Sequence, residues 1–535
     1  MKAELSDFIK VLEEKLVPLS RQTNLAYWNA AISGEDEDFS LFEDLSIQLT
    51  EVYSNKTYFK KLKKIKDSGT ISDPLYLRQI HLLYNAFLDN QVAPSLMRKR
   101  IKLETEIEKK YNNFRVLLKG HEINDNEVEE ILKESIYSDE VKEAWEAHKK
   151  IGPVVAKDIL ELVKLRNQIS VKLGFSNYHE MSLMLNDQHP AEVSALFDEL
   201  DALTRDVFVK QKIEIDFFLS NKFGIPQTDL RPWHYQNRYF QEAPAVSSLD
   251  LDHYFFDKDL EKLTIDYYKG LGLDITDLVA KSDLYEKPGK NQHAFCININ
   301  NGDDVRVLCN IKSNQYWMNT MLHEFGHGVY DKYIDQKLPF TLHEPSHIFT
   351  TEAIAMLFGR LSSNPQWLQD LVGITDQEKN DITEKCFNIL RTEQLVFSRW
   401  VQVMYRFEKS MYEDPDQDLN ALWWDLVEKY QMVKRPDNRD EPDWATKIHI
   451  ATSPCYYHNY LLGELLASQL LYYIARNVIH SEDVRLESFA NKKEVGAFLI
   501  DKIFKPGSTY HWSELIERAT GEALSARYYA KQFVD

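Results

Sequence analysis

Residues 318–334, MNTMLHEFGHGVYDKYI, are the stretch that decides what this sequence builds. His323 and His327 are four residues apart, so on a helix both imidazoles project from one face about a turn apart. Two histidines at this spacing can share a tetrahedral zinc ion. Glu324 lies between them, beside the open position of such a metal. The segment therefore predicts a helix that supplies two metal ligands and an acid.

A zinc site of this kind needs a third protein ligand. A histidine six residues after His327 would define the metzincin class, but Tyr333 stands there, so that class is excluded. The remaining common solution is a glutamate on a following helix, and TTEAIAMLFGRL (350–361) offers Glu352 after two threonines that can cap the helix start. Glu352 is the predicted third ligand. Rival ligands lie in a connection that contains a proline and should be less rigid: His343, Glu344 and His347.

The predicted ligand set implies a hydrolytic mechanism. Zinc lowers the pKa of its bound water towards about 7, while Glu324 accepts the proton and later delivers it to the leaving amine. Asp331 follows one turn after His327. The sequence leaves open whether Asp331 orients a ligand or is an acid exposed to solvent.

Outward from this segment the chain is mostly helical in pattern. Residues 1–220 show apolar residues at three- and four-residue spacing, as in LMRKRIKLETEIEKKYNNFRVLLKG (96–120), and predict an N-terminal helical lobe. Residues 224–244 are rich in Pro, Trp and Tyr and predict an irregular segment. Residues 221–535 form the predicted metal-binding catalytic lobe.

The clearest strand signal is a hairpin just before the histidine helix. HAFCINI (293–299) and VRVLCNI (305–311) are rich in β-prone residues and flank an Asn-Gly turn. Asn314 or Ser313 then stands in position to cap the helix that carries the histidines. The predicted fold class is mainly α with one small sheet.

Composition narrows the class of partner. The chain has 535 residues, of which 44% are hydrophobic and 28% charged, and its formal net charge is −20. This charge, without a basic run, disfavours nucleic acid as a partner. The N-terminus lacks an apolar signal core and no stretch reaches about 18 uninterrupted apolar residues, so we expect no membrane partner and a cytoplasmic protein. The cysteines are too few for a disulfide framework and are expected to be free thiols: Cys296, Cys309, Cys386 and Cys455.

Several motifs together resemble a known family. HEFGH (323–327), the glutamate 25 residues later and SPCYYHNYLLGELLASQL (453–470) are similar to the gluzincin zinc peptidases related to thimet oligopeptidase, oligoendopeptidase F and angiotensin-converting enzyme. LVKLRNQISVKLGF (162–175), the hairpin, and WWDLVEKYQ followed by KIH extend the resemblance over about residues 160–475. It implies a two-lobed, nearly all-α molecule with zinc at the floor of a deep channel and an edge strand beside it.

The resemblance also implies roles for residues outside the metal site. The strand positions that bind the substrate backbone are His293 and Ala294, as in β-augmentation. Tyr460 matches the donor that stabilises the oxyanion, and His449 matches the histidine that holds a substrate carbonyl. The residues matching a reader of the substrate C-terminus are Lys447, Tyr457 and Gln236. Alternatively, the histidines and tyrosines only pack in the core, and Lys447 is exposed to solvent.

Departures from the family pattern leave the cleavage mode open. Met356 stands where angiotensin-converting enzyme has an acid behind its metal, so orientation of the ligand must come from elsewhere. His458 and Asn459 replace a chloride-binding arginine between the paired tyrosines, which argues against chloride activation. Short peptides are the expected substrates. The expected activity is release of C-terminal dipeptides, with an oligoendopeptidase and a catalytically inactive peptide-binding scaffold as alternatives.

Overall fold

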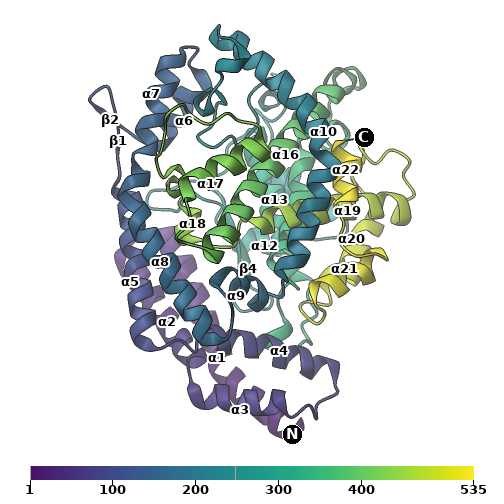
Figure 1. The fold of residues 1–535 in the computed structure, drawn as a ribbon. Helices are drawn as coiled ribbons and strands as arrows, with labels where there is room; N and C mark the ends of the chain where they lie inside the picture. The colour runs from purple at the N-terminus through teal and green to yellow at the C-terminus, as the bar shows by residue number, and fades with distance from the viewer. Residues whose placement is uncertain (1, 247–248, 535) are drawn as a thin grey trace. The chain divides into compact units, whose positions relative to one another are not determined.

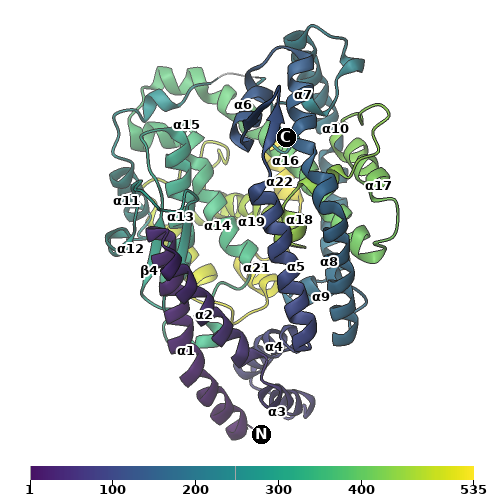
Figure 2. The ribbon, with the colours of Figure 1, turned by 90° about the vertical axis from the view of Figure 1, so that its left-hand side faces the viewer.

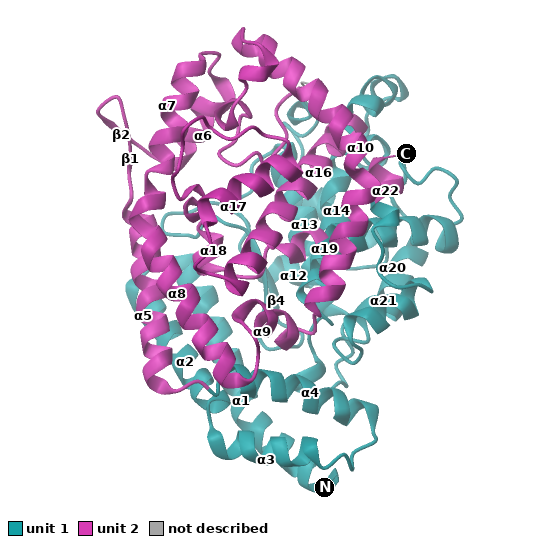
Figure 3. Ribbon diagram, viewed as in Figure 1, with its two compact units in different colours: residues 1–91, 249–386, 462–529 teal, residues 92–248, 387–461, 530–535 magenta. Residues whose placement is uncertain are grey.

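The structure is a computed structural model that describes residues 2–246 and 249–534. Figure 1 shows the ribbon, and Figure 3 divides it into two compact units. Unit 1 comprises Met1–Gln91, Leu249–Cys386 and Leu462–Tyr529, and unit 2 comprises Val92–Ser248, Phe387–Leu461 and Ala530–Asp535. Each unit therefore combines segments that are distant in sequence. The predicted lobes, 1–220 and 221–535, follow chain order instead, and that division stays a prediction.

The fold is mainly α, as predicted. Unit 1 contains helices α1 (Lys2–Ser33), α2 (Asp36–Tyr53), α3 (Lys56–Asp67), α4 (Pro74–Asp89), α11 (Leu260–Gly270), α12 (Thr276–Lys281), α13 (Gln315–Lys332), α14 (Ile348–Gly359), α15 (Pro365–Trp367), α20 (Lys493–Leu499) and α21 (Trp512–Thr520). Unit 2 contains α5 (Pro94–Asn113), α6 (Asp125–Glu134), α7 (Ser138–Lys149), α8 (Ile151–Leu173), α9 (Tyr178–Leu185), α10 (Pro190–Phe223), α17 (Leu419–Leu426) and α18 (His449–Thr452). The two units share three helices, each of which has residues in both: α16 (Asp376–Glu413), α19 (His458–Tyr473) and α22 (Arg527–Phe533).

The predicted hairpin is confirmed, with shorter strands. β3 (Phe295–Asn298) pairs antiparallel with β4 (Val305–Leu308), in a register that runs from Phe295 opposite Leu308 to Asn298 opposite Val305. The turn is tied by its own side chains, because Asn298 Oδ1 accepts a hydrogen bond from the backbone N–H of Gly302 at 3.0 Å. Compared with the predicted segments, β3 lacks His293, Ala294 and Ile299, and β4 lacks residues 309–311.

A second small sheet lies where a continuous helix was predicted. α5 ends at Asn113, and β1 (Val116–Leu118) then pairs antiparallel with β2 (His121–Ile123). Lys119 and Gly120 make the turn with φ of 51° and 84°, which suits a two-residue hairpin loop. The prediction of one sheet was therefore wrong: the Lys-Gly turn and the apolar run before it override the helical spacing of residues 96–120.

Two other expectations concern the irregular segment and the thiols. Residues 224–244 contain only the short 3-10 helices η1 (Gln227–Asp229) and η2 (Pro232–His234), which confirms the irregular reading. All four cysteines are free. Across residues 2–246 and 249–534, no helix is long and apolar enough to cross a membrane.

Candidate active site

Helix α13 presents the two histidines as the sequence predicts. Its N-cap is Asn314, whose side chain accepts a hydrogen bond from the backbone N–H of Trp317 at 2.9 Å. The rings of His323 and His327 are 5.0 Å apart at an angle of 80°. Figure 2 shows α13 running beside α14, the helix that carries Glu352.

Helix α14 begins earlier than the threonines suggested. Its N-cap is His347, whose side chain accepts a hydrogen bond from the backbone N–H of Phe349 at 3.2 Å. Thr350 completes the capping box, because its hydroxyl accepts from the backbone N–H of His347 at 3.3 Å. Glu352 therefore lies in the second turn of the helix, where its backbone is fixed on both sides.

Three ligand atoms converge between the two helices. One atom each from His323, His327 and Glu352 lie within 4.8 Å of one another, and this is the one such group found among the described residues. Glu352 Oε2 is 3.7 Å from His323 Nε2 and 3.9 Å from His327 Nε2. A tetrahedral zinc with bonds of about 2.0–2.1 Å separates its ligand atoms by about 3.4 Å. The three side chains therefore fit zinc after shifts of a few tenths of an ångström.

The rival ligands lie outside this group. Glu344 is exposed and accepts a hydrogen bond from Asn301 at 3.2 Å. His347 is occupied as the helix cap. His343 is buried, and neither of its ring nitrogens has a hydrogen-bond partner among the described residues. The structure thus brings together the predicted ligands and leaves the alternatives apart.

The electrostatics of the group suit a divalent cation. Burial lowers the pKa of His323 to about 4 and that of His327 well below its usual value, so both rings are neutral and can donate lone pairs. Burial, and then the charge of Glu352, raise the pKa of Glu324 to about 8, while a hydrogen bond from the Cys296 backbone opposes that rise. Burial, and then the charge of Glu464, raise the pKa of Glu352 to about 7. A bound cation would relieve the repulsion between these carboxylates.

Two glycines allow the helices around the ligands to approach closely. A Cβ atom on Gly326, between the two histidines, would lie 2.8 Å from the Cα of Ala355 in α14. A Cβ atom on Gly463 in α19 would lie 3.1 Å from the Cβ of Glu352 and 3.2 Å from the sulfur of Met356. The contact at Gly326 is tighter than a real Cβ atom accepts, so this position needs glycine for α13 and α14 to lie this close. At Gly463 a Cβ atom would require Glu352 or Met356 to shift by a few tenths of an ångström.

The hairpin residues expected to bind the substrate backbone lie just outside the strand. His293 is exposed and Ala294 is half-buried, and β3 begins one residue later at Phe295. Asp331 is half-buried rather than exposed. No hydrogen bond between described residues joins Asp331 to His323 or His327, and the side chain that contacts His327 is Thr351.

The remaining predicted residues gather in unit 2. The ring of Tyr457 is 5.3 Å from the ring of His449 and 5.4 Å from the ring of Tyr460. Lys447 Nζ lies 5.4 Å from the centre of the Tyr457 ring, and the Lys447 residue is 7% exposed. Burial, followed by the charge of Arg238, lowers the pKa of Lys447 to about 7. Sequence motifs alone had grouped these four residues, and the structure places them in contact.

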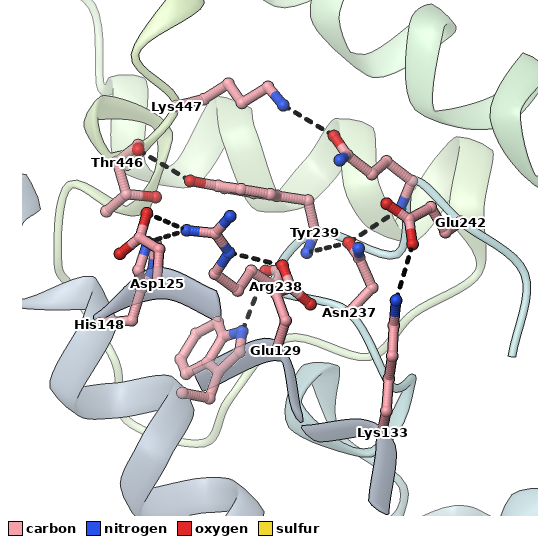
Figure 4. A network of polar contacts seen from close by, with 12 residues as sticks. Asp125, Glu129, Lys133, His148, Asn237, Arg238, Tyr239, Glu242, Thr446 and Lys447 are labelled. Atoms are coloured by element: carbon pink, nitrogen blue, oxygen red, sulfur yellow. Dashed lines mark hydrogen bonds and ion pairs between the residues drawn. The ribbon is translucent and has the colours of Figure 1, made fainter. Parts of the chain in front are cut away.

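The glutamine beside Lys447 is Gln241. Figure 4 shows the Lys447 ammonium pointing at a side-chain amide, and the bond is Lys447 Nζ to Gln241 Oε1 at 2.7 Å. Gln236 instead donates to the backbone carbonyl of Lys133 at 3.0 Å and accepts from the backbone N–H of Ala245 at 2.9 Å. Sequence reasoning missed Gln241, because nothing in an irregular segment says which glutamine faces the lysine.

Several known proteins are similar to this chain in sequence. A sequence profile of the peptidase M2 family, described as angiotensin-converting enzyme, matches residues 1–533. The chain is 22% identical to the angiotensin-converting enzyme of Theromyzon tessulatum over 560 aligned residues, covering 96% of this chain and 87% of that enzyme. It is 23% identical to thermostable carboxypeptidase 1 of Pyrococcus furiosus, over 43% of this chain and 49% of that protein. It is 24% identical to carboxypeptidase 1 of Bacillus subtilis, over 44% of this chain and 50% of that protein.

Proposed function

Because the chain belongs to the angiotensin-converting enzyme family of zinc metallopeptidases, we propose that it removes dipeptides from the free C-termini of short peptides. The environment of Lys447 is the observation that supports this mode of cleavage. Lys447 is 7% exposed, its hydrogen-bond partner is the neutral oxygen of Gln241, and none of the ion pairs between described residues includes it. The carboxylates of Glu129 and Glu242 act on it only through their charges, without contact. A buried cation that no carboxylate contacts favours an anionic ligand, and a peptide with a free C-terminus brings an α-carboxylate.

The proposed metal ligands are His323, His327 and Glu352. A zinc ion held there supplies Lewis acidity and an acidic water molecule. Glu324 accepts the proton of the attacking water and delivers it to the amine that leaves. The hydrogen bond from the Cys296 backbone supports this role, because it ties the carboxylate of Glu324 to strand β3.

We assign stabilisation of the tetrahedral intermediate to Tyr460. Its support is its place in the HNY motif of the family and its ring contact with Tyr457. A phenol O–H donates to an oxyanion without itself carrying charge, which suits a site that excludes water.

We propose that His449 donates a hydrogen bond to a carbonyl of the substrate. Burial, and then the charge of Lys447, lower the pKa of His449 to about 4, so the ring is neutral and carries one N–H that can donate. Its Nδ1 atom is buried and has no hydrogen-bond partner among the described residues. In the tautomer that carries the hydrogen on Nδ1, this atom is a donor without a partner, which costs free energy unless a ligand accepts its hydrogen bond.

We propose that the C-terminal carboxylate of the substrate is bound by Lys447, Gln241 and Tyr457. Gln241 takes the place expected for Gln236, since it is the glutamine that contacts Lys447. In the free protein Gln241 Oε1 holds the ammonium in place, and its amide nitrogen is left to donate to a ligand. We assign the backbone of the substrate to the edge beside His293 and Ala294, as the family pattern implies.

The two relatives named carboxypeptidase give a second candidate, removal of a single C-terminal residue. One experiment separates the possibilities. A defined decapeptide is incubated with the protein as free acid and as C-terminal amide, and the products are identified by mass spectrometry. Release of dipeptides from the free acid, with slow cleavage of the amide, supports the proposal. Single amino acids as first products would favour a carboxypeptidase, and equal internal cleavage of both peptides would favour an oligoendopeptidase.

A further inference from the structure

Two adjacent threonines in α14 have different tasks. Thr350 belongs to the helix cap, because its hydroxyl donates to the backbone carbonyl of His347 at 2.7 Å and accepts from the backbone N–H of the same residue at 3.3 Å. Thr351 has no part in that cap. Its hydroxyl lies 2.7 Å from Nδ1 of His327, and the Thr351 residue is 7% exposed.

The contact lies on the side of the imidazole that faces away from the metal group. Nε2 of His327 is the nitrogen near Glu352, at 3.9 Å from Oε2. A neutral imidazole carries its hydrogen on one nitrogen and a lone pair on the other. When Thr351 Oγ1 accepts a hydrogen bond from Nδ1–H, the lone pair stays on Nε2, where a metal needs it. The same bond fixes the rotation of the ring.

Among the residues that the structure describes, no carboxylate makes a hydrogen bond to His327. Met356, one turn after Glu352, has a thioether that cannot replace an acid, and Asp331 makes no hydrogen bond to His327 among the described residues. The partner of His327 is therefore neutral. Glu324 and Glu352 remain the two carboxylates at the group, and together they match the charge of a divalent cation.

We propose that Thr351 is the positioning residue that holds His327 in the tautomer and orientation for zinc. The inference concerns the metal site of the proposed peptidase, but it is tested by metal binding alone. Valine has nearly the shape of threonine without the hydroxyl, so Thr351→Val removes the hydrogen bond and little else. Serine keeps the hydroxyl, and Thr350→Val is the matched control, since it makes the same substitution one residue earlier.

The experiment measures the zinc dissociation constant of each variant by competition with a chromogenic chelator, together with the thermal stability of the metal-free protein. Thr351→Val should raise the dissociation constant about 10- to 100-fold, the range found for groups that orient a metal ligand. Thr351→Ser should bind zinc nearly as the unchanged protein does. Thr350→Val should keep its zinc affinity while the metal-free protein melts at a lower temperature, because the hydroxyl's half of the capping box is lost.

Two results would overturn the inference. One is an unchanged zinc affinity in Thr351→Val, or in Thr351→Ala if the valine variant does not fold. The other is an equal loss of zinc affinity in Thr350→Val and Thr351→Val, which would assign the effect to helix stability. Because no peptide is present, loss of zinc in Thr351→Val supports the inference even if the protein cleaves no dipeptide from any substrate.

Discussion

Replacing Lys447 with methionine should make the protein more stable and less active on free acids. Burial holds the pKa of Lys447 at about 7, against 10.5 for a lysine in water. Each pKa unit corresponds to about 1.4 kcal/mol, so keeping this lysine buried costs about 5 kcal/mol at most near pH 7. Methionine fills a similar volume and removes that cost, although Gln241 Oε1 then loses its donor, at about 1–3 kcal/mol. We expect a net gain of at most about 2–4 kcal/mol in unfolding free energy.

The sign of the pH dependence follows from the lowered pKa. Below pH 7 both folded and unfolded Lys447 are protonated, and the cost of burying the charge is fully present. Between pH 7 and 10.5 the unfolded chain binds the extra proton, so stability recovers as the pH rises. The advantage of Lys447→Met should therefore be largest below pH 7 and vanish near pH 10.5.

Activity should change in the opposite direction. A hydrogen bond to a charged group contributes about 1.5–3 kcal/mol, so kcat/KM for a free-acid peptide should fall about 10- to 150-fold, while the C-terminal amide is cleaved as before. Lys149 is the matched control, since it is 3% exposed, its pKa is also lowered to about 7 by burial, and it also lies in unit 2. Lys149→Met should raise the melting temperature without changing the ratio of free-acid to amide cleavage. If Lys447→Met loses stability and leaves the ratio of free-acid to amide cleavage unchanged, Lys447 does not bind the substrate carboxylate.

Three further predictions use the same preparations. Glu352→Gln should lose zinc and activity while Glu344→Gln keeps both, as measured by metal content after dialysis; equal metal in the two variants would contradict the ligand assignment. Tyr460→Phe should lower kcat about 10²- to 10³-fold with little change in KM, and an effect on KM alone would mean that Tyr460 only packs. The preference for free acid over amide should fall as the pH rises through 7, because Lys447 loses its proton there; a preference that stays flat to pH 9, or that persists in Lys447→Met, would argue against a lysine that reads the carboxylate.

The proximity of the three proposed metal ligands could be predicted because helical spacing is local. His323 and His327 share a face by their separation alone, and Glu352 follows once a third ligand on a helix is required. The capping residue Asn314 is also a local signal, and it is confirmed. Fold class follows in the same way from repeated apolar spacing over most of the chain.

The features that could not be predicted from the sequence depend mostly on contacts that only the folded chain shows. Gln241 and Gln236 are five residues apart in an irregular stretch, and only the folded chain shows which one meets Lys447. Thr351 looked like a cap because it precedes Glu352, but the N-cap of α14 is His347, so the hydroxyl of Thr351 is available to His327. The hairpin β1–β2 was hidden because its strands are three residues long and follow a strong helical pattern.

The proposed activity is zinc-dependent release of C-terminal dipeptides with Glu324 as the base. The most direct measurement is a time course of products from one free-acid decapeptide, with zinc content determined in parallel, for the unchanged protein and for Glu324→Gln. We expect a dipeptide and an octapeptide as the first products, formed only with zinc present, and a Glu324→Gln protein that binds zinc fully but is slower by about 10²-fold or more. Dipeptide release that continues in zinc-loaded Glu324→Gln at the original rate would contradict the role of Glu324 as the base.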